Sequence, residues 1–277
     1  MPGTRFRDIR RFESLDSTNL YLLAEARSGA AEGVVAVAEF QTAGRGRLGR
    51  RWEAPAGSNL LMSVLLRPDL RPDQRHLASS ALCLAAGDAV ERETGVVLAV
   101  KWPNDLLAPD GRKVAGVLAE SDVSGPGAPG PTPGRLPAVV VGIGINVNWP
   151  VDDDHLAPDL VGVAGSLRRL VGRPVDRAGL LESLLDALES RVDDLGSAAG
   201  RTGLVSVLRS RCSTLGAEVR VERDGRSLVG RAVDLTPDGH LVVERDGDVH
   251  TVLAGDVVHL RPVGGTAPAS GPARGRL

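Results

Sequence analysis

The chain contains few of the residues that mark specialised classes of protein. Its 277 residues include two cysteines, three tryptophans, three phenylalanines and one tyrosine, and its formal net charge is −2. Cys83 and Cys212 lie far apart and match no metal-ligand spacing or disulfide framework, so we expect a reduced, cytoplasmic protein. No apolar run approaches the ~20 residues of a membrane span, and the charged N-terminus lacks a secretory signal. The near-neutral charge argues against a protein that mainly coats nucleic acid.

Small aliphatic residues must supply the core instead. Hydrophobic residues make up 42% of the chain and charged residues 25%, which excludes wholesale disorder. Strand-like runs at residues 33–40, 59–66, 96–102, 106–107, 114–120 and 136–147 are interspersed with helical patterns at 16–29, 74–94, 162–171, 176–195 and 204–212. Residues 16–19 are expected to cap the first helix, with side-chain oxygens binding its first free amides. These patterns predict an α+β fold.

Composition divides the chain into unequal parts. Residues 1–213 carry the α+β pattern, interrupted by a Gly/Pro-rich stretch at 121–137 that we expect to be a flexible insertion at a surface turn. Residues 214–263 contain short alternating strands separated by three Asp-Gly turn signals, which predicts a small β-barrel module. Residues 264–277 form a Gly/Pro/Ala-rich tail that we expect to be disordered.

The most unusual motif is GRGRLGRRW, which runs from Gly44 to Trp52 and is called the Arg/Gly loop below. Its four arginines are interleaved with three glycines directly after a buried strand. Glycine allows a backbone to approach a ligand closely, and guanidinium groups bind phosphate or carboxylate. The loop therefore indicates a site that wraps an anion, although an exposed turn or an RNA-binding segment would have the same composition.

Two further motifs could contribute polar groups to such a site. The sequence KWPND, residues 101–105, ends a strand with a Trp-Pro pair that fixes the chain and presents Asn104 and Asp105. Lys113 and Gly116 follow on the next hairpin, where the lysine could neutralise a carboxylate or phosphate. Each residue taken alone is more simply explained as part of a capped turn or as a solvated lysine.

The motif GIGINV, residues 142–147, has only part of a dinucleotide-binding fingerprint, because the third glycine is absent. Its glycines could lie in a strand beside a ligand, with Asn146 as a polar reader, or could serve only close packing. Phosphate-loop, nucleophile-elbow and zinc-protease motifs are absent, and the acidic run 152–154 is expected to be a solvated turn.

Taken together and in this order, GRGRLGRRW, KWPND with Lys113 and Gly116, and GIGINV resemble the motifs of biotin protein ligases, the biotin–[acetyl-CoA-carboxylase] ligases. The resemblance runs from about residue 12 to about residue 262 and includes Ser17, Thr18, Asn19 and Gln41. It implies a mixed β-sheet with packed helices, related to class II aminoacyl-tRNA synthetases, in residues 1–213. It also implies an SH3-like barrel in residues 214–263.

The resemblance implies an ATP-dependent, two-step reaction. Biotin and ATP, with Mg²⁺, would form biotinyl-5′-AMP, and a lysine of a biotin carboxyl carrier domain would then take the biotin. The catalytic residues would be Arg47, Lys113 and Asp105. The biotin-binding residues would be Ser17, Thr18, Asn19, Gln41, Gly44, Arg45, Gly46, Arg47, Lys113 and Gly116. The residues that bind ATP or the adenylate would be Arg45, Arg47, Arg50, Trp52, Lys101, Asn104 and Asn146. Mg²⁺ would be held through the phosphates, with Asp105 as a possible protein contact.

Other functions remain open on sequence grounds. A lipoate ligase or octanoyltransferase shares the implied fold, and a nucleic-acid-binding protein could use the Arg/Gly loop. The motifs begin too near the start of the chain to leave room for a helix-turn-helix before Ser17, so we expect the monofunctional type that does not bind DNA. We expect a monomer or weak homodimer that does not enter membranes.

Overall fold

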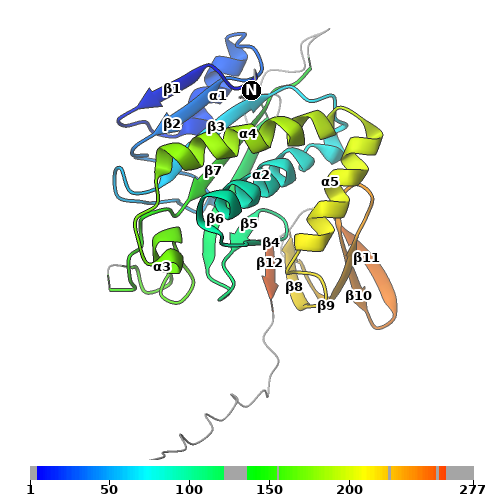
Figure 1. Ribbon diagram of the computed structural model, residues 1–277. Helices are drawn as coiled ribbons and strands as arrows, with labels where there is room; N and C mark the ends of the chain where they lie inside the picture. The colour runs from blue at the N-terminus through cyan, green and yellow to red at the C-terminus, as the bar shows by residue number, and fades with distance from the viewer. Residues whose placement is uncertain (1–4, 122–135, 155, 224–225, 254–255, 260–277) are drawn as a thin grey trace, which may run out of the picture.

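The computed structural model describes residues 5–121, 136–154, 156–223, 226–253 and 256–259 (Figure 1). Most of the insertion predicted at 121–137 and all of the tail predicted at 264–277 lie outside these residues. Within them, no helix has the length and apolarity needed to cross a membrane.

A seven-stranded sheet forms the larger part of the molecule (Figure 1). Its strands are β1 (Ile9–Phe12), β2 (Val35–Ala38), β3 (Leu60–Leu66), β4 (Ala99–Lys101), β5 (Asp105–Leu107), β6 (Lys113–Ser121) and β7 (Val139–Ile145). Their spatial order is β1-β2-β3-β7-β6-β5-β4, in which β1 and β2 are parallel and every other neighbouring pair is antiparallel. The helices are α1 (Thr18–Arg27), α2 (Leu77–Thr94), α3 (Leu167–Val171), α4 (Arg177–Leu195) and α5 (Ala198–Arg211). The sheet is therefore mixed, as the resemblance implied.

One face of this sheet is packed against α2, with α4 lying beside α2 (Figure 1). Side chains alternate between the two faces of a strand, and on β7 it is Val141, Ile143 and Ile145 that join the core with α2. Helix α2 is buried along most of its length and ends at Gly95, whose φ of 74° closes the helix in the left-handed conformation. This face is the main hydrophobic core.

The opposite face is covered only in part. Helix α1 packs there against Leu65 of β3 and Val140 of β7, which lie in a smaller hydrophobic cluster. Further along the same face of β7 come Gly142 and Gly144, and Gly116 of β6 is paired with Gly144. Because glycine carries no side chain, this row leaves space above the strands beyond the N-terminus of α1.

The C-terminal strands form a second, five-stranded antiparallel sheet. Its strands are β8 (Glu218–Arg223), β9 (Arg226–Leu235), β10 (Leu241–Arg245), β11 (Asp248–Val252) and β12 (Asp256–His259), in the order β11-β10-β9-β8-β12. Trp102, at the end of β4, joins this part to the larger sheet, since its indole N–H donates to the carbonyl of Gly239 at 3.1 Å and its backbone N–H donates to Thr214 Oγ1 at 3.0 Å. The predicted strand-rich C-terminal module is confirmed as an antiparallel sheet.

Two local predictions were wrong. Ser17 stands at the N-cap of α1, but its side chain makes no capping hydrogen bond there. The first helical amide, that of Thr18, donates to the side chain of Gln41, at 2.8 Å from Oε1. The helix expected at 162–171 covers only α3, which begins after Ser166. The residues before it pair with β6, where Lys113 N–H donates to the carbonyl of Val163 at 2.7 Å, so a tertiary contact replaces the first helical turns.

Candidate active site

A buried group of hydroxyl and amide side chains lies where α1 begins. Thr18 Oγ1 is 3.2 Å from Gln41 Oε1 and 2.7 Å from Ser63 Oγ, and Ser63 Oγ donates to Asn19 Oδ1 at 2.6 Å. Ser17, Thr18, Asn19 and Ser63 are all buried. A buried polar group is stable only when it has a hydrogen-bond partner, so this cluster is suited to a neutral polar ligand that can exchange bonds with it.

Asn19 connects this cluster to a carboxylate on β6. Its Nδ2 donates to the Leu118 carbonyl at 3.2 Å and to Glu120 Oε2 at 2.9 Å, while Glu120 Oε1 lies 2.9 Å from Arg45 Nη1. A Cβ atom on Gly142 would overlap Asn19 Oδ1, so the glycine is needed for this arrangement. The N-terminus of α1 and the Arg/Gly loop are thereby linked through the side chain of Glu120.

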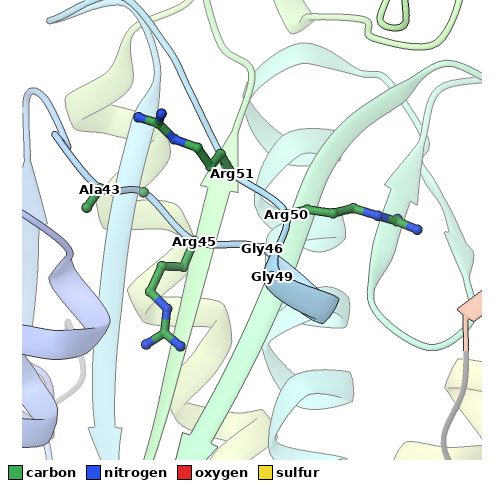
Figure 2. Close-up of a pocket in the computed structure, with 7 residues that line it drawn as sticks. Ala43, Arg45, Gly46, Gly49, Arg50 and Arg51 are labelled. Carbon is green, nitrogen blue, oxygen red and sulfur yellow. The ribbon is translucent and has the colours of Figure 1, made fainter. Parts of the chain in front are cut away.

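The Arg/Gly loop folds back on itself. Trp52 N–H donates to the carbonyl of Gly44 at 3.0 Å, and Gly46 N–H donates to the carbonyl of Arg50 at 2.7 Å. Residues 43–46 and 49–51 enclose a hollow of about 230 Å³. In Figure 2, Arg45 lies over the strands of the sheet, whereas Arg50 and Arg51 point in other directions. The arginines of the loop therefore do not converge on one point.

Trp52 lies in the space left by the glycine row. A Cβ atom on Gly144 would overlap the indole ring, and one on Gly116 would come within 3.2 Å of it. Lys113 Nζ is 5.6 Å from the centre of the ring, within the range of a cation–π contact. The indole Nε1 is buried and has no hydrogen-bond partner among the described residues. An acceptor atom of a ligand could satisfy it.

The KWPND motif and Lys113 meet beside this tryptophan. Lys113 Nζ is 2.7 Å from Asp105 Oδ1, and Arg47 Nη1 donates to Asn104 Oδ1 at 3.0 Å. Lys101 ends β4 opposite Asp105 and is half-buried. Two cations from different parts of the sequence, Arg47 and Lys113, are thus held by neighbouring side chains of the KWPND motif, Asn104 and Asp105 respectively.

Asn146 follows the glycine row but is engaged internally. Its Nδ2 donates to the carbonyl of Gly165 at 2.9 Å, and its Oδ1 accepts from Asn59 Nδ2 at 3.2 Å. Asn146 is buried, so its role as a reader of a ligand stays a prediction. Among the described residues, no three His, Cys, Asp or Glu side chains are grouped so as to hold a metal ion.

Sequence reasoning missed three residues of this region, Ser63, Asn59 and Glu120. Each is a polar residue in or beside an apolar strand, and Ser63 interrupts the run NLLMSVLL. That interruption is the signal that could have identified it, because an apolar strand rarely buries a hydroxyl without a partner. The sequence gives no such signal for Glu120. Whether its side chain lies on the face of the Arg/Gly loop depends on how β6 pairs with β7, which a local pattern does not contain.

Comparison with known proteins places this site in a family. Residues 11–130 match the model of the Biotin/lipoate A/B protein ligase family, and residues 214–260 match the biotin protein ligase C terminal domain. The chain is 39% identical over 268 residues to the biotin–[acetyl-CoA-carboxylase] ligase of Mycobacterium tuberculosis, with 94% of this chain and 91% of that protein covered. The chain belongs to the biotin protein ligase family.

Further relatives agree with this assignment. The bifunctional ligase/repressor BirA of Bacillus subtilis is 30% identical over 243 residues, which cover 88% of this chain and 71% of that protein. The biotin protein ligase from Aquifex aeolicus, whose structure was determined in complex with biotin and ATP, superposes with a TM-score of 0.76 at 26% identity, covering 92% of this chain and all of that one. The resemblance inferred from the motifs is therefore confirmed. So is the implied architecture of a mixed sheet with packed helices followed by a C-terminal domain, which the structure shows as an antiparallel sheet.

Proposed function

We propose that this chain activates biotin with ATP to biotinyl-5′-AMP and transfers the biotin to a lysine of a biotin carboxyl carrier domain, such as that of acetyl-CoA carboxylase. The observation that carries the proposal is the position of the Arg/Gly loop. Arg45 is linked to the buried polar cluster at the start of α1 through Glu120, which binds both Arg45 and Asn19. Arg47 reaches Asn104, next to the Lys113–Asp105 pair. One loop therefore connects a site suited to a ureido group with a site suited to phosphates.

The polar cluster supports the binding of the ureido head. This head is neutral, carries two N–H donors and one carbonyl acceptor, and must find partners once it is buried. The Gln41 side chain is bonded to Thr18, and Ser17 lies next to them. These three residues would exchange bonds with the ureido group, while Gly44 and Gly46 allow the loop backbone to approach the valeryl tail.

Arg47 and Lys113 support the activation step. A biotin carboxylate oxygen must form a bond to the α-phosphorus of ATP while pyrophosphate leaves, so two anions must meet. At 4 Å, two unit charges repel by about 4 kcal/mol at an effective dielectric of 20. Pre-placed cations offset this repulsion in the transition state. Mg²⁺ would enter with ATP as part of the substrate, held through the phosphates.

The transfer step needs retention of the activated product. The acceptor lysine, as a free amine, attacks the acyl carbon of the adenylate, the bond to AMP breaks, and the amine loses a proton as the amide forms. The mixed anhydride is open to hydrolysis, so a loop that covers it excludes water until the acceptor arrives. The Arg/Gly loop would have this role, with Trp52 and Asn146 flanking the adenine and Asp105 helping to position the attacking lysine.

We further propose that residues 1–213 form the catalytic unit and residues 214–263 an SH3-like module. The free, buried Cys83 and Cys212 fit a reducing cytoplasm, and burial raises the pKa of both thiols, which keeps them unreactive. The near-neutral net charge supports a function that does not depend on DNA. We also propose that the protein is a monomer or weak homodimer.

Mass spectrometry of a carrier domain tests the proposed function directly. After incubation with biotin, ATP and Mg²⁺, we expect one biotin on a single lysine, with matching release of pyrophosphate. Lipoate in place of biotin is the matched control, because it distinguishes biotin ligation from the related acyl transfers. Pyrophosphate release that depends on lipoate but not on biotin would contradict the proposal.

A further inference from the structure

Glu120 connects two parts of the site that are far apart in sequence. It lies on β6 four residues beyond Gly116, on the same face of the strand, and its side chain is only 20% exposed. Its two oxygens have different partners, Asn19 Nδ2 at 2.9 Å and Arg45 Nη1 at 2.9 Å. A mostly buried carboxylate is stable only when it is paired in this way.

The Arg/Gly loop thus contacts the sheet at two separate points. Trp52 packs over Gly116 at one end of β6, and Arg45 reaches Glu120 at the other. Four residues of strand span roughly 13 Å, so the two contacts hold the loop across the sheet rather than at a single hinge. The Trp52 contact depends on shape, whereas the Arg45 contact depends on the charge of Glu120.

Arg45 and Arg47 contact different residues. Arg45 faces a carboxylate, and Arg47 donates to the neutral amide of Asn104. A guanidinium beside a carboxylate has much of its charge offset locally. Arg45 is therefore suited to anchor the loop.

We propose that Glu120 is a positioning residue of the biotin site. It acts through Arg45 to hold the Arg/Gly loop over the sheet, and through Asn19 to fix the buried polar cluster to the same point. This inference rests on the proposed function for the identity of the ligand, but the positioning of the loop can be measured without any ligand.

Enzyme kinetics of Glu120→Gln test the inference. The amide keeps the shape of the side chain but removes the charge that holds Arg45, so we expect the KM for biotin and the off-rate of the adenylate to rise about three- to tenfold. We expect kcat for pyrophosphate release at saturating biotin to change less than twofold. Glu25→Gln is the matched control, because it removes an ion pair of similar exposure, Arg10–Glu25 at 2.7 Å, on α1.

A double-mutant cycle separates positioning from general stability. If Glu120 acts through Arg45, Glu120→Gln adds less than twofold to the KM for biotin in an Arg45→Gln background. Independent effects that multiply in the double variant would overturn the inference. So would a KM for Glu120→Gln that matches the KM for Glu25→Gln.

Amide hydrogen exchange of the ligand-free protein distinguishes this inference from the proposed function. We expect the Gly46 and Trp52 amides, which are bonded within the loop, to exchange faster in Glu120→Gln than in the wild type and in Glu25→Gln. Unchanged exchange would overturn the positioning role even in an active biotin ligase. Faster exchange in a protein that releases no pyrophosphate with biotin would support the positioning role and refute only the proposed function.

Discussion

The two faces of the seven-stranded sheet are built by the same strands but have opposite properties. On β7, Ile143 and Ile145 join the helix-covered core, whereas Gly142 and Gly144 lie on the face of the Arg/Gly loop. On β3, Met62 and Val64 pack with the core, and Ser63 between them binds Asn19. The face covered by α2 is filled with apolar side chains. The face under the Arg/Gly loop has glycines that leave space and polar side chains that form hydrogen bonds.

This difference shows how a buried strand can carry a site. Alternation gives each strand one set of side chains for packing and a second set that is free to serve ligand binding. Where the second set is reduced to glycine, another segment can approach the backbone, as Trp52 does at Gly144. Substitutions at neighbouring positions should therefore affect different properties.

The largest effect is expected on the face of the Arg/Gly loop, from Lys113→Met. This change removes a cation that lies 2.7 Å from Asp105 and beside Trp52, so we expect kcat for pyrophosphate release to fall about 100- to 1000-fold. A stopped assay of pyrophosphate at saturating biotin and ATP measures it. The double variant Lys113→Met with Asp105→Asn checks whether the uncompensated carboxylate, rather than the lost cation, causes the loss.

If kcat of Lys113→Met stayed within threefold of the wild type, the site would not use this lysine as a counter-charge. Lys113→Arg gives a further distinction, because it keeps the charge but changes the donor geometry. Recovery of activity by arginine would mean that charge alone is sufficient at this position.

The next largest effect is expected from Gly144→Val. A side chain at this position would displace the Trp52 indole from the glycine row and move the Arg/Gly loop with it. Because small displacements of catalytic groups cost large factors in rate, we expect kcat/KM for biotin to fall about 100-fold. The same pyrophosphate assay, with thermal unfolding to confirm the fold, tests this.

Ile143→Val is the matched control on the other face of the same strand. It removes one methyl group from the core against α2, so the expected cost is about 0.5–1.5 kcal/mol of unfolding free energy. We expect its kcat/KM at 25 °C to stay within twofold of the wild type. Equal losses of activity in both variants would mean that the two faces are not functionally distinct.

Local patterns predicted most of the fold. The residues of α2 show helical spacing and end at a glycine, and the chain does turn there, at Gly95. β1 and β12 were not predicted, because IRRF and DVVH are short and carry charged residues, and each is a strand only through pairing with β2 or β8. Such edge strands depend on distant partners, which a local pattern does not contain.

The candidate site divides in the same way. The motifs identified the residues of the Arg/Gly loop, Lys113 and Asp105, because their composition is unusual in itself. Ser63 and Glu120 were missed, since each belongs to the site only through the register of its strand. Register requires the pairing of residues far apart in sequence, so it could not be predicted from spacing alone.

The smallest effect is expected on the helix-covered side, where α2 meets the C-terminal sheet. His76 precedes α2 and its ring lies 4.5 Å from that of His240. Burial, and then the neighbouring His240, hold the pKa of His76 below its usual value of 6.5. Two acidic residues, Asp73 and Asp238, lie near this histidine pair. The backbone carbonyl of Asp73 is 3.0 Å from His76 Nδ1, and the side-chain carboxylates of both residues are paired with Arg71.

Because the folded-state pKa of His76 is below the unfolded-state value, the unfolded chain binds more protons just below pH 6.5. The contribution of His76 to stability is therefore complete above pH 6.5 and decreases as the pH falls from there toward the lower folded-state pKa. Thermal unfolding between pH 7.5 and 5.5 should show a smaller decrease in Tm for His76→Gln than for the wild type, while the exposed His250→Gln should follow the wild type. Parallel curves for the wild type and His76→Gln would mean that the surroundings of His76 do not restrict its protonation in the folded protein.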